Sequence, residues 1–449
     1  MKIKLKFGVI VQSLVTIIVM QGAQAEDLFT VYLHAKERDY KVRIAEEDYI
    51  ARLEQSNQAL ADLKPKVTLS ARAGYNAGRN WNDLGNSNTS TASGNYTLSL
   101  TKPLYRPQVS ERIVQSSLVI AQAEEALIAE QQNLILRVAE AYFGYLQARD
   151  AAELAREEAN SLAHQSAQVT AFFEAGRSAF TAVQESRARL AEARSNIFSM
   201  DQNIEIALEK LYSLTGQEYK VLSGTPDQTP LRMPEPNNIN AWLEEASVIN
   251  SQVIAALFAV EIAQKSVDIA IAAKRPTIDF FANQGSSASF GRAGSDSQSL
   301  EASFGIQLNS SRYDSGKTDA MIREAQDNVR KALLQVEVQR DTAVQQTQSN
   351  FLTIETGEAQ IGAFWRSLQA SQAAAKATQG GFEAGTRTAV DVILSVRDVY
   401  RAERNFVSAK YNFLLNTIRL KQSAGILGEE DLRVLSNIMN RTRTTWLVD

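Results

Sequence analysis

The chain has 449 residues, no cysteine, two histidines and a formal net charge of −4. The lack of cysteine excludes a disulfide framework, a thiolate metal site and a cysteine nucleophile. An acidic chain without a basic patch also argues against a nucleic-acid partner. Glycine (22) and proline (8) are sparse, and this bias favours long helices over a loop-rich fold.

Residues 1–25 predict a secretory signal peptide. Lys2, Lys4 and Lys6 form a basic start, residues 7–20 are apolar, and Ala23-Gln24-Ala25 is a small-x-small cleavage site. A membrane anchor is the alternative, but the apolar run is short for a span of about 20 residues. No later stretch of about 18 residues is apolar without a charge, which argues against a spanning helix elsewhere. We therefore expect an exported protein.

Residues 26–214 predict a first structural repeat that begins with a helix and a β-hairpin. Helical spacing of apolar residues continues to residue 63, and Pro65 ends this helix because proline disfavours a helical residue before it. Strict alternation of polar and apolar residues then predicts a hairpin over 66–103. Its middle, residues 79–93, is rich in Asn, Gly and Ser and is expected to form a loop.

A very long helix follows, over about residues 108–172. The stretch lacks proline and would extend for about 100 Å. Its many alanines allow the close helix packing of a coiled-coil-like wall. A tip turn at 173–178 reverses the chain into another helix, which ends near Leu214. The proline-rich residues 215–240 predict an irregular connector.

Residues 241–425 repeat the same order of elements. A helix precedes a hairpin over 277–309, in which residues 285–298 are expected to form a Gly/Ser loop. A long helix over about 314–379 leads to a tip turn at 382–388. Both turns contain Phe-Glu-Ala-Gly, so the two halves are expected to share one structure.

The two hairpins provide four strands, each with one apolar and one polar face. Four strands cannot close a barrel in a membrane, because barrels need about eight or more to pair every strand edge. Two copies would give eight strands and a filled interior, whereas three copies would give twelve strands around a passage. The pattern therefore favours a trimer with one shared 12-stranded transmembrane barrel. The alternative is a soluble hairpin packed on helices, which also alternates.

Motifs for chemistry are missing. The sequence has no glycine-rich phosphate loop, no HExxH motif and no Gly-x-Ser-x-Gly motif. Neither His34 nor His164 has an evident partner in the pattern. We therefore predict no catalytic, cofactor-binding or metal-binding residues and do not expect an enzyme.

One polar cluster surrounds the second tip turn and includes Thr386, Arg387, Thr388 and Asp391. The hydroxyls are expected to cap the next helix. Arg387 and Asp391 are four residues apart and could pair along one helix face. In a threefold assembly the helix ends would converge on an axis, where one carboxylate becomes a ring of three.

Residues 382–427, FEAGTRTAVDVILSVRDVYRAERNFVSAKYNFLLNTIRLKQSAGIL, resemble the TolC family of outer-membrane efflux ducts. A weaker counterpart, FEAGRSAFTAVQESRARLAEARSNI, occupies residues 173–197. The order of elements matches as well, so the resemblance covers nearly all of the expected mature chain. The lack of cysteine departs from the lipid-anchored branch of the family and fits the unacylated branch.

The resemblance implies a trimer in outer-membrane lipid, with long helices forming a tunnel across the periplasm. It places the connector and the C-terminal segment, residues 426–449, in an equatorial region around that tunnel. It also implies two protein partners, an inner-membrane transporter and a periplasmic adaptor (membrane fusion) protein. The expected function is that of a passive exit duct for drug efflux, type I protein secretion or both.

The resemblance also assigns roles to individual residues. Arg387 and Thr181 match positions of the closed-state latch, and Asp391 matches one of two constriction carboxylates. Gly176 and Gly385 lie in the tip turns, which are expected to contact the adaptor.

Three positions depart from the family pattern: Leu394 replaces the second constriction carboxylate, Phe382 a latch tyrosine and Ala182 a latch aspartate. Either the gate is looser here, or apolar packing holds it shut. Two rival functions remain open: a periplasmic adaptor or structural coiled coil without a pore, and a diffusion porin. Long helices argue against the porin, because porins join their strands with short turns.

Overall fold

The computed structural model describes residues 26–82, 85–224, 231, 233–291, 296–310 and 313–444, without the side chains of 80–89 and 440–444. The expected signal peptide, residues 1–25, lies outside the described residues, as do parts of the expected connector and the end of the C-terminal segment.

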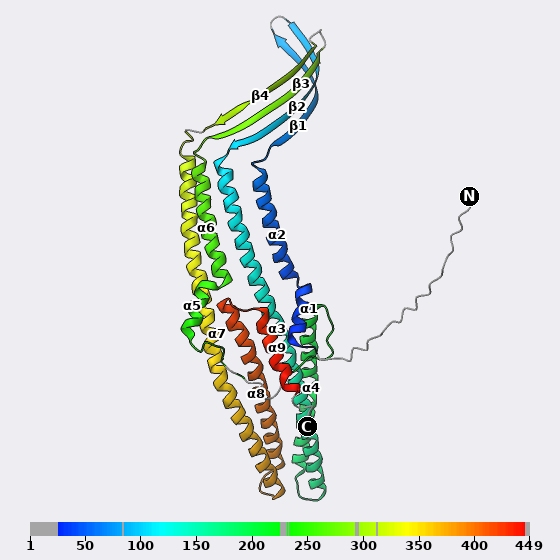
Figure 1. Ribbon diagram of the computed structural model, residues 1–449. Helices are drawn as coiled ribbons and strands as arrows, with labels where there is room; N and C mark the ends of the chain where they lie inside the picture. The colour runs from blue at the N-terminus through cyan, green and yellow to red at the C-terminus, as the bar shows by residue number, and fades with distance from the viewer. Residues whose placement is uncertain are drawn as a thin grey trace, which may run out of the picture.

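The fold is mainly helical, with one antiparallel sheet at one end (Figure 1). In chain order the elements are α1 (Leu28–Arg38), α2 (Tyr40–Ala61), β1 (Lys66–Asn82), β2 (Gly85–Tyr105), α3 (Pro107–Glu174), α4 (Phe180–Thr215), α5 (Ile239–Ile249), α6 (Ser251–Ala272), β3 (Thr277–Gly291), β4 (Ser297–Asn309), α7 (Lys317–Glu383), α8 (Ala389–Ala424) and α9 (Glu429–Thr444). The two long helices, α3 with 68 residues and α7 with 67, confirm the prediction from the proline-free stretches.

The helix before each hairpin is divided in two, which the apolar spacing did not predict. Asp39 separates α1 from α2, and its side chain accepts hydrogen bonds from the backbone of Lys41 and Val42. Asn250 separates α5 from α6, and its side chain accepts one from the backbone of Gln252. Each residue leaves the helical conformation and caps the following helix, as short polar side chains favour. The break therefore occurs at the same place in both repeats.

Both predicted loops inside the hairpins are too long, because the strands extend far into them. In the first hairpin the ladder runs without interruption to the pair Asn82 and Gly85. In the second, β3 extends to Gly291 and β4 begins at Ser297. Small polar residues are usual in loops, but a ladder satisfies their backbone groups equally well when both of its faces are exposed. Both pairs of strands end within the predicted loops, so composition overestimated the length of the loops and not their position.

The sheet has the order β1-β2-β3-β4, so β1 and β4 are edge strands within one chain. The strand pairing confirms the predicted faces. Apolar residues line up in rows, as in Val67 with Leu100 and in Ala282 with Phe304. Polar residues line up on the other face, as in the row Thr68, Ser99, Asn283 and Ser303. Phe304 on the apolar face is 82% exposed, so one chain leaves this surface uncovered.

The largest apolar cluster lies midway along the molecule, where α1, α3, α4, α8 and α9 meet. It includes Tyr32, Tyr142, Leu211, Ile418 and Leu432, all almost fully buried. Below it, α3 with α4 and α7 with α8 form two helical hairpins that point away from the sheet (Figure 1). The sheet and the two tip turns therefore lie at opposite ends.

One described stretch, Ile239–Ala272, is long and apolar enough to cross a membrane by length and mean hydropathy alone. It contains Glu244, Glu245 and Glu261, which is why a search for uncharged runs did not find it. The backbone leaves the helix at Asn250, and both parts pack along α7. Ile239–Ala272 therefore forms two helices, α5 and α6, that pack against α7.

Candidate gate at the helical tips

Each helical hairpin reverses at a glycine with positive φ, Gly176 at 71° and Gly385 at 77°. The turns close with matching backbone hydrogen bonds, since Arg177 donates to the carbonyl of Phe172 and Thr386 to that of Gly381. Left-handed backbone favours glycine, because other residues pay a steric penalty. A Cβ at either glycine would meet no atom within 4 Å. Conformation, and not crowding, therefore requires these two glycines.

Thr388 and Asp391 begin α8 with a reciprocal capping box. The Thr388 hydroxyl accepts a hydrogen bond of 3.2 Å from the Asp391 backbone, and an Asp391 carboxylate oxygen accepts from the Thr388 backbone and hydroxyl, each at 2.9 Å. This confirms the capping interpretation of the hydroxyl at Thr388. Hydrogen bonds from Thr388, and more weakly the charge of Arg387, lower the pKa of Asp391 below its usual value. The carboxylate is therefore ionised at neutral pH in the single chain.

Arg387 is exposed at the tip, and among the described ion pairs none joins it to Asp391. Its side chain lies over the backbone of Gly381. No described hydrogen bond joins it to Thr181, which is exposed on the first turn of α4. The suggested pairing of Arg387 with Asp391 along one helix face is thus replaced by the capping box. The structure brings Asp391 and Arg387 to one tip and Thr181 to the other.

An apolar cluster, here called the tip cluster, joins the two tips. It is formed by residues from all four helices of the two hairpins: Val169, Phe172, Ala182, Val183, Phe382, Ala389, Val392 and Val396. The rings of Phe172 and Phe382 lie 5.2 Å apart between centroids. Phe382 and Ala182 are two of the three departures from the family pattern, and both lie in this cluster. At these two latch positions, apolar packing therefore replaces the polar side chains that the family pattern leads one to expect.

Leu394 lies three residues after Asp391 on α8 and is partly exposed. Its neighbour Ile393 is buried in a second apolar cluster with Ala159, Leu162 and Ala193. This cluster continues the packing between the hairpins away from the tips.

Farther from the tips, polar contacts connect α3 to α8. Arg404 Nη1 lies 2.8 Å from Glu158 Oε2, and the hydroxyls of Ser161 and Tyr400 lie 2.8 Å apart. Sequence reasoning missed these residues, because carboxylates and basic residues alternate along many of the helices and nothing local marks this pair.

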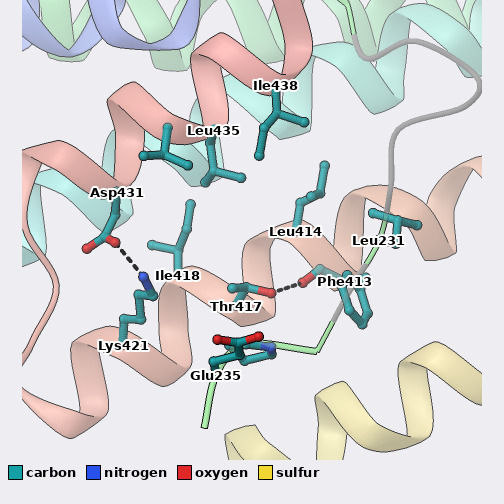
Figure 2. Close-up of a pocket in the computed structure, with 12 residues that line it drawn as sticks. Leu231, Glu235, Phe413, Leu414, Thr417, Ile418, Lys421, Asp431, Leu435 and Ile438 are labelled. Atoms are coloured by element: carbon teal, nitrogen blue, oxygen red, sulfur yellow. Dashed lines mark hydrogen bonds and ion pairs between the residues drawn. The ribbon is translucent and has the colours of Figure 1, made fainter. Parts of the chain in front are cut away.

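A groove of about 680 Å³ lies between α8, α9 and the chain segment that precedes α5 (Figure 2). Leu414, Ile418, Leu435 and Ile438 give it apolar walls, and an ion pair between Lys421 and Asp431 closes one end (Figure 2). Within the described part of the chain, no group of three or more His, Asp or Glu residues could hold a metal ion.

Comparison with known proteins supplies the family. The profile of the outer membrane efflux proteins matches residues 31–217 and 242–426, which are most of both repeats. The chain is 29% identical to the outer membrane protein TolC of Escherichia coli K12 over 434 residues, which cover 94% of this chain and 87% of that protein. It is 26% identical to the alkaline protease secretion protein AprF of Pseudomonas aeruginosa, over 94% of this chain and 89% of that protein.

Solved structures agree on the fold. The crystal structure of CusC, a protein that forms a transmembrane channel, aligns with a TM-score of 0.75 at 18% identity, over 89% of this chain and 92% of that one. Because the family profile matches most of the chain, the chain belongs to the outer membrane efflux protein family, a family of outer-membrane transport channels.

Proposed function

We propose that three copies of the chain form a passive exit duct through the outer membrane and the periplasm, for efflux of small molecules, type I protein secretion or both. The observation that carries this proposal is the four-stranded sheet with two unpaired edges and one exposed apolar face. A sheet of this kind cannot lie in lipid alone, because its edge groups would remain unpaired. Pairing β4 of one copy with β1 of the next closes twelve strands around a passage.

The tips are the proposed gate of this duct. Asp391 of three copies would form a carboxylate ring at the constriction, and Leu394 adds no second ring. The capping hydrogen bonds lower the pKa of Asp391, whereas repulsion within a ring would raise it. Arg387 would contact Thr181 of the neighbouring hairpin through its backbone or hydroxyl. The tip cluster, which includes Phe382, supplies closure by apolar packing.

An adaptor of the membrane-fusion type and an inner-membrane transporter are the proposed partners. TolC and AprF are named as an outer-membrane protein and as a protease secretion protein, and this chain resembles both. Gly176 and Gly385 would lie at the surface that meets the adaptor. Residues 26–214 and 241–425 would each form one of the two repeats in every copy, joined by the connector 215–240.

The test is to purify the mature chain in mild detergent and measure both its native mass and its conductance in planar bilayers. A trimer mass together with single channels of low conductance is expected. A monomer without channel activity would contradict the duct and favour the alternative, a periplasmic adaptor or structural coiled coil.

A further inference from the structure

We propose that Glu158 and Arg404, supported by Ser161 and Tyr400, form a clamp between the two helical hairpins that holds the tips closed. The proposal rests on the duct function above and assigns a role in gating to residues outside the tip turns. The term clamp is used here for these four residues.

The clamp consists of two consecutive contacts between antiparallel helices. α3 runs toward the tips and α8 away from them, so Glu158 and Ser161 on α3 face Arg404 and Tyr400 on α8. Residues three or four apart lie on the same face of a helix, so both contacts lie on one seam. Parting the hairpins along this seam would break the ion pair and the hydrogen bond together.

The two partners of the ion pair differ in how deeply their side chains are buried. The side chain of Glu158 is 9% exposed, whereas that of Arg404 is 29% exposed. A buried charge that loses its partner is strongly unfavourable, whereas a partly exposed one can turn to water. Arg404 therefore offsets the cost of burying the Glu158 carboxylate in the closed arrangement.

A cavity of about 180 Å³ lies beside the clamp and extends to Leu394 near the constriction. Its walls include Arg189, Glu192 and Arg397. Glu158 and Arg404 line the same cavity, so parting the hairpins would widen it and admit more water to Glu158. Loss of Arg404 thus disfavours the closed state more than the open one.

The clamp lies far enough from the tips that a small change in the angle between the hairpins at the clamp would move the tips much farther. Glu158 precedes Gly176 by about 27 Å of helix. Between the clamp and the tips, the contacts described from one hairpin to the other are the two apolar clusters and weak contacts of Gln379 with Gln165 and Gln168. Apolar clusters can shift between packings, but an ion pair with a buried carboxylate favours one register. The clamp therefore fixes the relative position of hairpins whose tip latch has lost its carboxylate.

Single-channel recording of full-length trimers tests the clamp. Arg404→Gln is expected to raise the occupancy of the high-conductance state by about ten-fold or more. Glu158→Gln should have a smaller effect, because Arg404 can then turn to water. The matched control is Arg401→Gln, since Arg401 lies on the same helix and, among the described residues, its ion pair is with Asp398 of that helix. The control should conduct like the unchanged protein.

The exchange Glu158→Arg with Arg404→Glu separates gating from folding. If the clamp acts as proposed, the open occupancy of the exchange variant is lower than that of Arg404→Gln and close to that of the unchanged protein. Equal occupancy in Arg404→Gln and Arg401→Gln, with trimers intact by native mass, would overturn the clamp. An unchanged protein without channels would instead overturn the duct itself. If Arg404→Gln forms no trimers while the exchange does and conducts as the unchanged protein, the pair serves assembly, and the clamp is overturned.

Discussion

Asp391 completes the capping box of α8, and the proposed duct also places its carboxylate at the constriction. Two substitutions separate these roles. Asp391→Asn removes the charge but keeps an oxygen that can accept from Thr388, whereas Asp391→Ala removes both. We expect both variants to lower cation selectivity and to weaken block by multivalent cations in single-channel recordings. Because Leu394 adds no second carboxylate, either change alone should remove most of the selectivity. If both variants keep the selectivity, the carboxylate acts only as a cap.

Phe382 is the residue at which the proposed closure by apolar packing can be tested. Its ring packs on Phe172 within the tip cluster. Phe382→Ala should cost about 3 kcal/mol of packing in the closed tip, as buried phenylalanines usually do. The expected result is a larger mean conductance. Phe180→Ala is the control, since Phe180 is 58% exposed and contacts Phe173 outside the cluster. Equal conductance in the two variants would contradict apolar closure.

For individual residues, the sequence predicted only contacts between neighbours along the chain. The cap at Thr388 was predictable because capping involves residues three apart in the chain. The contacts of Glu158 with Arg404 and of Phe172 with Phe382 join residues more than 200 positions apart. Their identities follow from how the two hairpins pack, and no local pattern marks them.

Element boundaries show the same division between local and distant causes. Both 67- and 68-residue helices and both hairpins follow from periodicity and from the positions of proline. The breaks at Asp39 and Asn250 were missed because apolar spacing continues across them, although a short polar side chain is a signal for a cap. The strands extend into the Ser- and Asn-rich segments because pairing with a neighbouring strand, and not residue type, decides their length.

The faces of β4 allow a prediction for the membrane. Phe304 lies on the apolar face of the sheet and is exposed in one chain. Phe304→Arg would place a charge in lipid and should cost about 2–4 kcal/mol near the middle of the bilayer. Fewer heat-resistant trimers are expected on gels of unboiled samples. Ser303→Arg is the matched control, since the adjacent residue points to the polar face and should assemble normally. A reversed result would mean that the polar face contacts lipid.

The whole molecule separates its functions by distance, with the sheet at one end and the tip turns at the other (Figure 1). Family resemblance and pattern together predicted this arrangement, because a long helix, α3 or α7, leads from each hairpin of the sheet to a tip turn. The arrangement of three copies depends on the free strand edges and on exposed helix faces. A change at a tip should therefore affect docking without affecting assembly in the membrane.

Gly385 is suited to test that separation, because one substitution there can add bulk alone and another can add bulk and backbone strain. Asparagine tolerates left-handed backbone, whereas valine does not. Gly385→Asn adds bulk in open space and should reduce crosslinking to the adaptor and export, with trimers intact. Gly385→Val also strains the turn and should loosen the start of α8. The measurements are export in cells, crosslinking to the adaptor and native mass. If Gly385→Asn exports normally while Gly385→Val loses export and trimers together, the glycine serves only the turn, and the adaptor must dock elsewhere on the tips.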